Sequence, residues 1–489
     1  MISKSFFKSS IIYTVVGALP YMSGFILLFW FTAWLTPVQF GINALYLSLM
    51  YFVLIVSTAG WDMSVGILHF DYRDNETKLK EFIGTVYTGL LILGGGSLIL
   101  FSLGGFQFFR FTFSGGDFLE LVPFGMFTIL SGIFNGIFKS YTGLLVNLQK
   151  PVLFFWLNLS NFIITIIASL TLLYLFPYTL YGPVLGRLIP AIISAAISLI
   201  MVARHYGFHW HVVYFRKILS YSAPLLVSAI LLWVVTYIDR FIILKFLADP
   251  VLVGVYDIAI KLVLGIDLLI AGLVNSITPK VYSIWKSQNI SHSTVEVNRY
   301  YNALTALVLV LIPVIIILAP IILPFLIKKP IYYQAFQYLP LLAAGYAARV
   351  WFYMFLAPIM FFKRTRAMIT ISVISAVVQI GVGIVMIKMF GLWGAVLTNI
   401  LIKIVQAIFL YLESRKVFQY KINKWKIVYF PILVIMLVFA SEIFISSGYR
   451  IWAAGFQLIF TCALIYLTYR RELSELVGKL SHLLYKPKE

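Results

Sequence analysis

Long apolar stretches separated by short polar segments run along almost the whole chain. Fourteen of these stretches reach the roughly 20 residues that an α-helix needs to cross the hydrocarbon core of a bilayer. The period-two alternation of a membrane β-barrel is absent from the sequence, and a lipid-exposed backbone must satisfy its own hydrogen bonds. The pattern therefore predicts an all-α polytopic membrane protein. The predicted spans are residues 10–33, 41–67, 81–105, 118–145, 152–175, 180–203, 219–246, 251–278, 300–326, 332–361, 367–389, 391–412, 427–446 and 449–469.

Composition indicates that lipid is the solvent of most side chains. Hydrophobic residues make up 62% of the sequence and charged residues only 11%, whereas water-soluble proteins keep a charged exterior. Lysine and arginine outnumber aspartate and glutamate by 37 to 17, as expected for inner loops that face anionic lipid. Anionic membrane lipid is therefore an expected partner, and nucleic acid is not. Cys462 is the single cysteine, so neither an internal disulfide nor a thiolate metal cluster can form.

Counting lysine and arginine by loop orients the predicted spans. With the N-terminus inside, 25 basic residues fall in inner segments, six at outer ends and six within spans. Basic residues concentrate in cytoplasmic loops, so this ratio places both termini in the cytoplasm. The outer loops are short, the longest running from about residue 106 to residue 117. With no room there for a catalytic domain and no nucleotide-binding motif, the sequence argues against an enzyme such as a polymerase or glycosyltransferase and predicts no cofactor.

An internal repeat divides the chain. Residues 37–41 (PVQFG) recur as residues 250–254 (PVLVG) at an offset of 213, and residues 182–185 (GPVL) recur as residues 394–397 (GAVL) at an offset of 212. Two matches far apart at nearly the same offset indicate duplicated six-helix lobes, related by an axis along the membrane normal.

The repeat sets the predicted domain organisation. The divisions are an N-terminal lobe (1–203), a cytoplasmic linker (204–218), a C-terminal lobe (219–412), a cytoplasmic loop (413–426), two accessory helices (427–470) and a cytoplasmic tail (471–489). The substrate path is expected between the lobes.

Charged residues inside the spans are the candidate functional residues, because a charge at the bilayer centre costs roughly 2.5–3.5 kcal/mol unless it faces water, a partner or a ligand. Six basic residues fall in this class: Lys139, Arg187, Arg240, Lys261, Arg349 and Lys403. The acids within spans are Asp62, Asp239, Asp257 and Asp267, with Glu442 near an outer end. We interpret the basic set as a cationic, substrate-binding cavity and the four aspartates as groups for ion coupling or for latching helices together.

Spacing indicates which of these charges can pair. Asp257 and Lys261 are four residues apart and can neutralise one another on one helix face. Asp239 and Arg240 are neighbours, but adjacent helical positions point about 100° apart, so we do not expect the two side chains to be partners in space. They are interpreted as part of a latch between helices, with a ligand site as the alternative.

Arg187, Arg349 and Lys403 have no acid within one helical turn, which makes them the strongest candidates for binding an anion. A diphosphate suits them, because arginine forks and lysine point charges bind phosphate oxygens. Other roles stay open. Arg187 is close enough to the outer surface to contact lipid headgroups, Lys403 and Lys139 could snorkel or pair across helices, and Asp62 could fix helix packing or relay ions.

Several segments resemble one family of transporters. Residues 238–247 (IDRFIILKFL), followed by residues 253–256 (VGVY) and 259–262 (AIKL), are similar to the seventh and eighth helices of bacterial polysaccharide flippases of the Wzx type. Residues 35–41 (LTPVQFG) and 60–62 (GWD) are similar to the first outer loop and second helix of the same proteins. These flippases belong to the multidrug/oligosaccharidyl-lipid/polysaccharide exporter superfamily.

The resemblance implies two lobes arranged as a V in the bacterial cytoplasmic membrane and transport by alternating access. The implied cargo is a polyprenyl-diphosphate-linked oligosaccharide, namely an O-antigen, capsule or exopolysaccharide repeat unit. A proton or sodium ion is the expected coupling ion, and a polysaccharide polymerase is a candidate protein partner. Two alternatives remain: a multidrug or cation antiporter of the same superfamily, and a flippase for lipid-linked peptidoglycan precursor.

Overall fold

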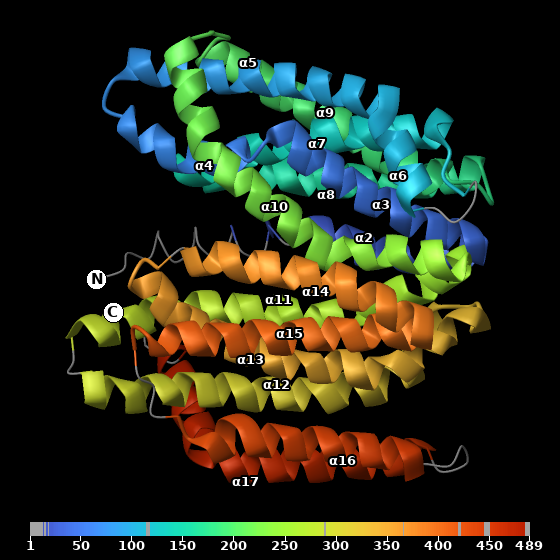
Figure 1. Cartoon of the computed structure of the whole chain (residues 1–489), viewed down its shortest axis with the longest axis vertical. Helices are drawn as coiled ribbons and strands as arrows, with labels where there is room; N and C mark the ends of the chain where they lie inside the picture. Colours follow the sequence, from blue (N-terminus) through green and yellow to red (C-terminus); the bar gives the residue numbers. More distant parts are fainter. Residues whose placement is uncertain are drawn as a thin grey trace. The chain divides into compact units, whose positions relative to one another are not determined.

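The structure, a computed structural model, describes residues 13, 16–17, 19–113, 118–287, 290–364, 366–418, 422–444 and 450–484 (Figure 1). The described residues are helical apart from short connections, and they contain no strand. Ten of their helices are long and apolar enough to cross a membrane, and two shorter apolar helices are Met22–Trp34 and Trp425–Val438. Each of the fourteen predicted spans overlaps a helix, although the beginning of the span at 10–33 and the end of the predicted tail lie outside the described residues. The predicted all-α polytopic fold class is therefore confirmed, whereas the orientation in the membrane stays a prediction.

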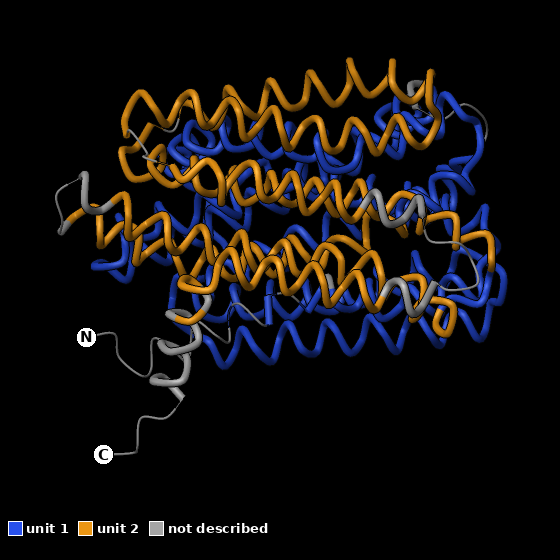
Figure 2. The backbone as a smooth tube through the Cα atoms, turned by 90° about the horizontal axis from the view of Figure 1, so that it is seen from below, with its two compact units in different colours: residues 1–257, 327–329 blue, residues 258–326, 330–489 orange. Residues whose placement is uncertain are grey.

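The chain forms two compact units, unit 1 (residues 1–257 and 327–329) and unit 2 (residues 258–326 and 330–489) (Figure 2). The helices of unit 1 are α2 Leu19–Trp34, α3 Pro37–Thr58, α4 Trp61–Leu68, α5 Glu76–Leu100, α6 Phe106–Phe113, α7 Met126–Asn147, α8 Pro151–Leu175, α9 Tyr181–His205 and α10 Val212–Leu247. α11, Pro250–Ser287, begins in unit 1 and continues into unit 2.

Unit 2 contains the rest of α11 and the later helices. These are α12 Ile290–Leu326, the 3-10 segment η4 Pro330–Tyr338, α13 Leu339–Phe361, α14 Arg366–Phe390, α15 Leu392–Arg415, the π-helical turn η5 Trp425–Tyr429, α16 Phe430–Phe444 and α17 Arg450–Leu484. The division into units falls within α11, later in the chain than the linker predicted at residues 204–218. α10 packs against α3, α4, α5 and α6 of unit 1, although the repeat makes it the first helix of the second half. The lobe boundaries stay a prediction.

One predicted span is interrupted. Residues 41–67 were expected as a single helix, but the chain breaks between α3 and α4, where Ala59 (φ 48°) and Gly60 (φ 74°) adopt the left-handed conformation. A Cβ at Gly60 would lie 3.1 Å from both the carbonyl oxygen of Ser222 and the amide nitrogen of Leu226. The break therefore lets α10 approach the start of α4 closely, which a residue other than glycine would hinder.

Packing in the two halves follows the repeat. At the offset of the repeat, α7, α8 and α9 recur as α13, α14 and α15. A Cβ at Gly182 would lie 2.5 Å from Leu173 Cγ, and a Cβ at Gly394 would lie 2.0 Å from the carbonyl oxygen of Met386. Equivalent glycines thus let α9 approach α8 and α15 approach α14 in the same way.

α3 and α11 begin alike and touch at equivalent glycines. Each starts with proline at its first position, preceded by Thr36 and by Asp249, whose side chains accept backbone N–H groups. A Cβ at Gly41 would lie 1.7 Å from the carbonyl oxygen of Pro250, and one at Gly254 would lie 3.3 Å from the amide nitrogen of Gly41. The two helices therefore cross with their backbones in contact.

The two accessory helices are fastened to unit 2 by polar contacts. Lys426 Nζ is 2.6 Å from Glu472 Oε1, which also accepts a 3.1 Å hydrogen bond from Asn302 Nδ2 of α12. Trp351 Nε1 of α13 donates to the carbonyl oxygen of Ile427 at 2.7 Å, and the Tyr469 hydroxyl donates to the carbonyl oxygen of Lys426. These contacts anchor the start of η5 and the later part of α17.

Candidate functional site

Three helices of unit 2 bring together charged residues that are far apart in the sequence. Arg349 of α13 donates from Nε to Asp267 Oδ1 of α11 at 3.1 Å. Lys403 of α15 donates to Asn399 Oδ1 at 2.8 Å and lies 3.9 Å from the centre of the Tyr346 ring. We call these five residues the Arg349 cluster. The guanidinium of Arg349 and the ammonium of Lys403 also interact electrostatically with one another and with Asp267.

The Arg349 cluster carries more positive than negative charge. Two cations share the single carboxylate of Asp267, because the other two members, Asn399 and Tyr346, are uncharged. The Arg349 side chain is 24% exposed and that of Asp267 is 29% exposed, so the ion pair is neither sealed in the core nor free in bulk solvent. A surplus cation at membrane depth is costly unless an anion or water reaches it. The cluster is therefore suited to binding an anionic group.

Neighbouring residues fix the direction of the two cations. The Arg349 guanidinium lies 4.7 Å from the Phe352 ring centre and 5.3 Å from the Tyr353 ring centre, distances typical of cation–π contacts. A Cβ at Gly345 would lie 3.3 Å from Lys403 Cδ, so the absence of a side chain leaves room for the lysine stem. Such support limits the conformations of both side chains, and so lowers the entropy lost when a ligand binds.

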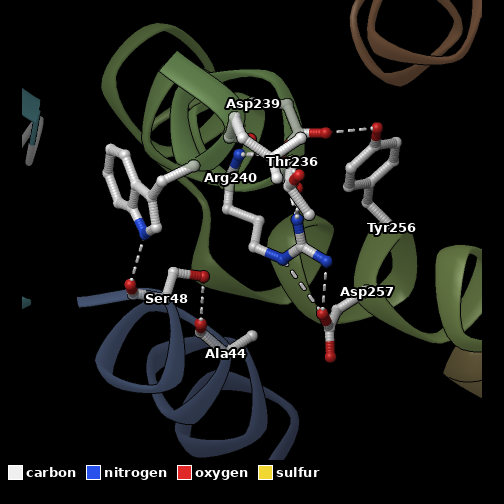
Figure 3. Close-up of polar contacts among 9 residues, drawn as sticks. Ala44, Ser48, Thr236, Asp239, Arg240, Tyr256 and Asp257 are labelled. Atoms are coloured by element: carbon white, nitrogen blue, oxygen red, sulfur yellow. Dashed lines mark hydrogen bonds and ion pairs between the residues drawn. The ribbon is translucent and has the colours of Figure 1, made fainter. Parts of the chain in front are cut away.

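A second group of charges is buried in unit 1, where α10 meets the start of α11 (Figure 3). Arg240 donates from Nε to Asp257 Oδ1 at 3.0 Å, from Nη2 to the same oxygen at 3.0 Å, and from Nη1 to Asp239 Oδ1 at 3.0 Å. The Tyr256 hydroxyl donates to Asp239 Oδ2 at 2.6 Å, and Arg240 Nη1 also donates to the carbonyl oxygen of Thr236. This network, which we call the Arg240 clamp, holds consecutive helices together, as a latch would.

The clamp corrects one prediction. Asp239 and Arg240 are partners in space, because the long arginine side chain folds back along α10 and reaches its neighbour's carboxylate. The direction of the Cα–Cβ bonds, on which the prediction rested, does not limit a side chain of that length. The side chains of Arg240, Asp239 and Asp257 are 5%, 2% and 3% exposed, so the network is sealed. The Asp257–Lys261 pair stays a prediction.

Two further candidate residues lie on packed helices of unit 1. Lys139 of α7 makes a 2.8 Å ion pair with Asp62, in the first turn of α4. Arg187 of α9 is partly buried and interacts electrostatically with Tyr51 and Asp257. α7 packs directly against α9, and the equivalent helices α13 and α15 pack against one another in the same way. Each of these four helices carries one candidate cation.

The energetic cost of a charge within the membrane identified the candidate cations from the sequence, but it did not identify the residues with which they pair. Asp267 and Arg349 belong to different helices, as do Asp62 and Lys139, so neither pair is visible at helical spacing. Asn399 was missed, although it precedes Lys403 by four residues and that spacing was the available signal. Tyr256 was missed because its role in the clamp depends on the α10–α11 crossing.

Comparison with known proteins gives a family and a fold. The model of a family described as polysaccharide biosynthesis protein matches residues 6–285. No curated protein matches the chain. The structure of lipid II flippase MurJ in an inward closed conformation aligns with a TM-score of 0.74 at 15% identity, covering 96% of this chain and 99% of that chain.

Two transporter structures align less closely. An inward-facing multidrug resistance transporter of the MATE family has a TM-score of 0.65 at 12% identity, covering 83% of this chain and 93% of that chain. A MOP superfamily transporter from Pyrococcus furiosus, described as having a binding pocket of reversed polarity, has a TM-score of 0.60 at 13% identity, covering 84% and 95%. At these identities the likeness shows the fold alone.

Proposed function

The chain belongs to the polysaccharide biosynthesis protein family, and from this premise we propose that it flips a polyprenyl-diphosphate-linked oligosaccharide from the inner to the outer leaflet of the bacterial cytoplasmic membrane. The resemblance to polysaccharide flippases is confirmed at the level of the family. The chain is a multi-pass membrane protein with the fold of flippases and multidrug transporters rather than of an enzyme. The cargo and its path belong to the proposal.

The observation that carries the proposal is the surplus of positive charge in the Arg349 cluster. A diphosphate offers several anionic oxygens, which an arginine fork and a lysine ammonium can bind together. Asp267 neutralises one of the two cations, so Lys403 is left with the uncharged ligand Asn399. Binding of a phosphate group would compensate the remaining charge at membrane depth.

In the proposed cycle, the cluster draws the diphosphate head away from lipid while the polyprenyl tail stays in the bilayer, and alternating access then exposes the head on the outer side. The energy could come from a proton, a sodium ion or the membrane potential, which is worth about 2.3 kcal/mol per charge per 100 mV. Asp62, Asp239, Asp257 and Asp267 are the candidate coupling groups. Asp239 and Asp257 already serve the Arg240 clamp, which favours a latch for that pair.

Two other cargoes compete with the oligosaccharide. Lipid-linked peptidoglycan precursor carries the same polyprenyl diphosphate, so the cluster would suit it equally. An organic cation would be repelled by the cluster, because the two cations outnumber the single acid. The charge balance therefore disfavours multidrug export.

The proposal is tested by translocation of a fluorescent polyprenyl-diphosphate oligosaccharide in proteoliposomes. Lys403→Met removes a cation without leaving an acid unpaired, and Arg349→Gln combined with Asp267→Asn removes both members of the ion pair, so that Lys403 is the remaining charge of the cluster. Arg364→Ala is the matched control, because Arg364 is an exposed basic residue of the same unit. We expect both cluster variants to lose transport by about tenfold or more, and the control to keep it.

Three results would count against the proposal. Unchanged flipping by both cluster variants would refute the Arg349 cluster as the binding site. Absence of flipping by the wild type under proton, sodium and potential gradients would refute the proposed cargo. Faster transport of a peptidoglycan-precursor head than of any oligosaccharide would replace the cargo with that precursor.

A further inference from the structure

The internal repeat allows the charges of the two units to be compared position by position. At the offset of 213 residues found at the start of the repeat, Arg349 and Asp267 correspond to Gly136 and Leu54. In unit 1 those two positions form a close packing contact, because a Cβ at Gly136 would lie 2.8 Å from the Thr58 side chain and 3.6 Å from the carbonyl oxygen of Leu54. An ion pair cannot fit at that level of unit 1. The equivalent helices of unit 1 nevertheless carry a cation and an acid, at positions further along the helices than those of the Arg349–Asp267 pair.

The shifted pair is Lys139 with Asp62. Lys139 follows Gly136 by three residues, which is close to one helical turn, so the two lie on neighbouring parts of one face of α7. Asp62 lies in α4, which together with α3 corresponds to α11 of the second half. Both units thus place a basic residue on the fourth helix of the repeat and pair it with an aspartate from the second.

The geometry of this pair leaves the lysine available to a ligand. Asp62 is 8% exposed and lies in the first turn of α4, where the helix N-terminus favours a carboxylate. Lys139 is 52% exposed and lies within a helix of membrane-spanning length. An ammonium has three donors, and the 2.8 Å contact with Asp62 uses one of them. Asp62 therefore holds the ammonium in place, and about half of the lysine side chain stays exposed.

We propose that Lys139, held by Asp62, is a second anion-binding site of this protein, built by unit 1 and separate from the Arg349 cluster of unit 2. It takes a phosphate or carboxylate group of the cargo, which extends the proposed flippase function. Arg187, on the neighbouring helix α9, adds positive charge to the same unit, as Lys403 does on the equivalent helix α15. Each duplicated half then contributes its own anion-binding cation.

The alternative is that the Lys139–Asp62 pair only joins α7 to α4, and charge exchange separates the two roles. Lys139→Asp with Asp62→Lys keeps an ion pair but moves the cation to a buried position. Lys139→Met with Asp62→Leu replaces the pair with apolar side chains of similar size. Lys139→Arg keeps the charge and the position. Thermal unfolding of each variant is measured beside translocation, so that a misfolded protein is recognised before transport is interpreted.

We expect Lys139→Arg to keep most transport, and both double variants to lose it by about tenfold or more with little change in unfolding temperature. Transport that is restored by the exchanged pair, or kept by the apolar pair, would overturn the second site. The Lys403→Met variant is assayed in the same vesicles, so loss there with normal transport in the Lys139 double variants rejects the second site alone and leaves the proposed function standing.

Two cargoes identify the group that is bound. One carries a neutral oligosaccharide on the polyprenyl diphosphate, and the other carries an oligosaccharide with a uronic acid. An equal loss for both cargoes in the apolar double variant assigns the site to phosphate, and a loss confined to the acidic cargo assigns it to a sugar carboxylate. Equal transport of both cargoes by the variant and the wild type overturns the proposal.

Discussion

Replacing Gly41 by alanine tests the backbone crossing of α3 and α11. The new Cβ would lie 1.7 Å from the carbonyl oxygen of Pro250 and 2.6 Å from its carbonyl carbon, far inside van der Waals contact. Neither atom can move away as a flexible side chain could, because both belong to the backbone at the start of α11. The start of α3 is held as well, by the capping box of Thr36 and Gln39 and by Lys329, which donates to the carbonyl oxygen of Leu35.

The expected magnitude follows from two opposing effects. Overpacking of this kind costs about 1–3 kcal/mol, and a backbone clash belongs at the upper end of that range. Alanine within a helix is more favourable than glycine by about 0.5–1 kcal/mol. We therefore expect Gly41→Ala to destabilise the protein by about 2 kcal/mol.

The assay is thermal unfolding in detergent, followed by chromatography of the protein that survives heating. Gly381→Ala and Gly95→Ala are the matched controls, since a Cβ at either position meets nothing within 4 Å. Both controls should be neutral or slightly stabilising. If Gly41→Ala unfolds at the wild-type temperature, the two backbones do not touch as the structure describes.

Two other predictions concern buried charges. Arg240→Met should destabilise unit 1 by about 3–5 kcal/mol, because it leaves Asp239 and Asp257 without their shared cation, and adding Asp239→Asn and Asp257→Asn should recover most of the loss in an unfolding assay. Burial tends to raise the pKa of Glu472, but hydrogen bonds from Lys426 and from Asn302 outweigh it and hold the pKa below its usual 4.5. A lowered pKa in the folded protein means that the ion pair stabilises above pH 4.5 and is lost as the pH falls through the folded value, so the wild type should be more stable than Glu472→Gln at pH 7 and approach it in acid.

The helices could be predicted because each one needs about 20 apolar residues in a row, and that signal does not depend on the rest of the fold. The break after Thr58 was not predicted, although the sequence shows Ala59 and Gly60. Its cause is the close approach of α10, which lies much later in the chain. The repeat predicted equivalent helix starts at Pro37 and Pro250, because proline suits the first position of a helix and this preference is local.

The candidate site could likewise be predicted only in part from the sequence. The cost of burying charge points to Arg349 and Lys403 from the sequence alone, since it depends only on each residue and its depth. The identity of each partner depends on which helices pack together, so Asp267 could not be assigned to Arg349. Asp239 was wrongly separated from Arg240, because helical angles describe where a side chain starts and not where its end lies.

The packing of α10 on unit 1 has a consequence for how the protein is made. α10 packs against α3, α4, α5 and α6, which all lie within residues 1–257, and only residues 327–329 of unit 1 come later. At a synthesis rate of about 5–20 residues per second, the stretch from 258 to 489 occupies the ribosome for roughly 10–45 seconds more. Unit 1, with the first helix of the second repeat already in place, therefore has time to assemble in the membrane before most of unit 2 has been translated.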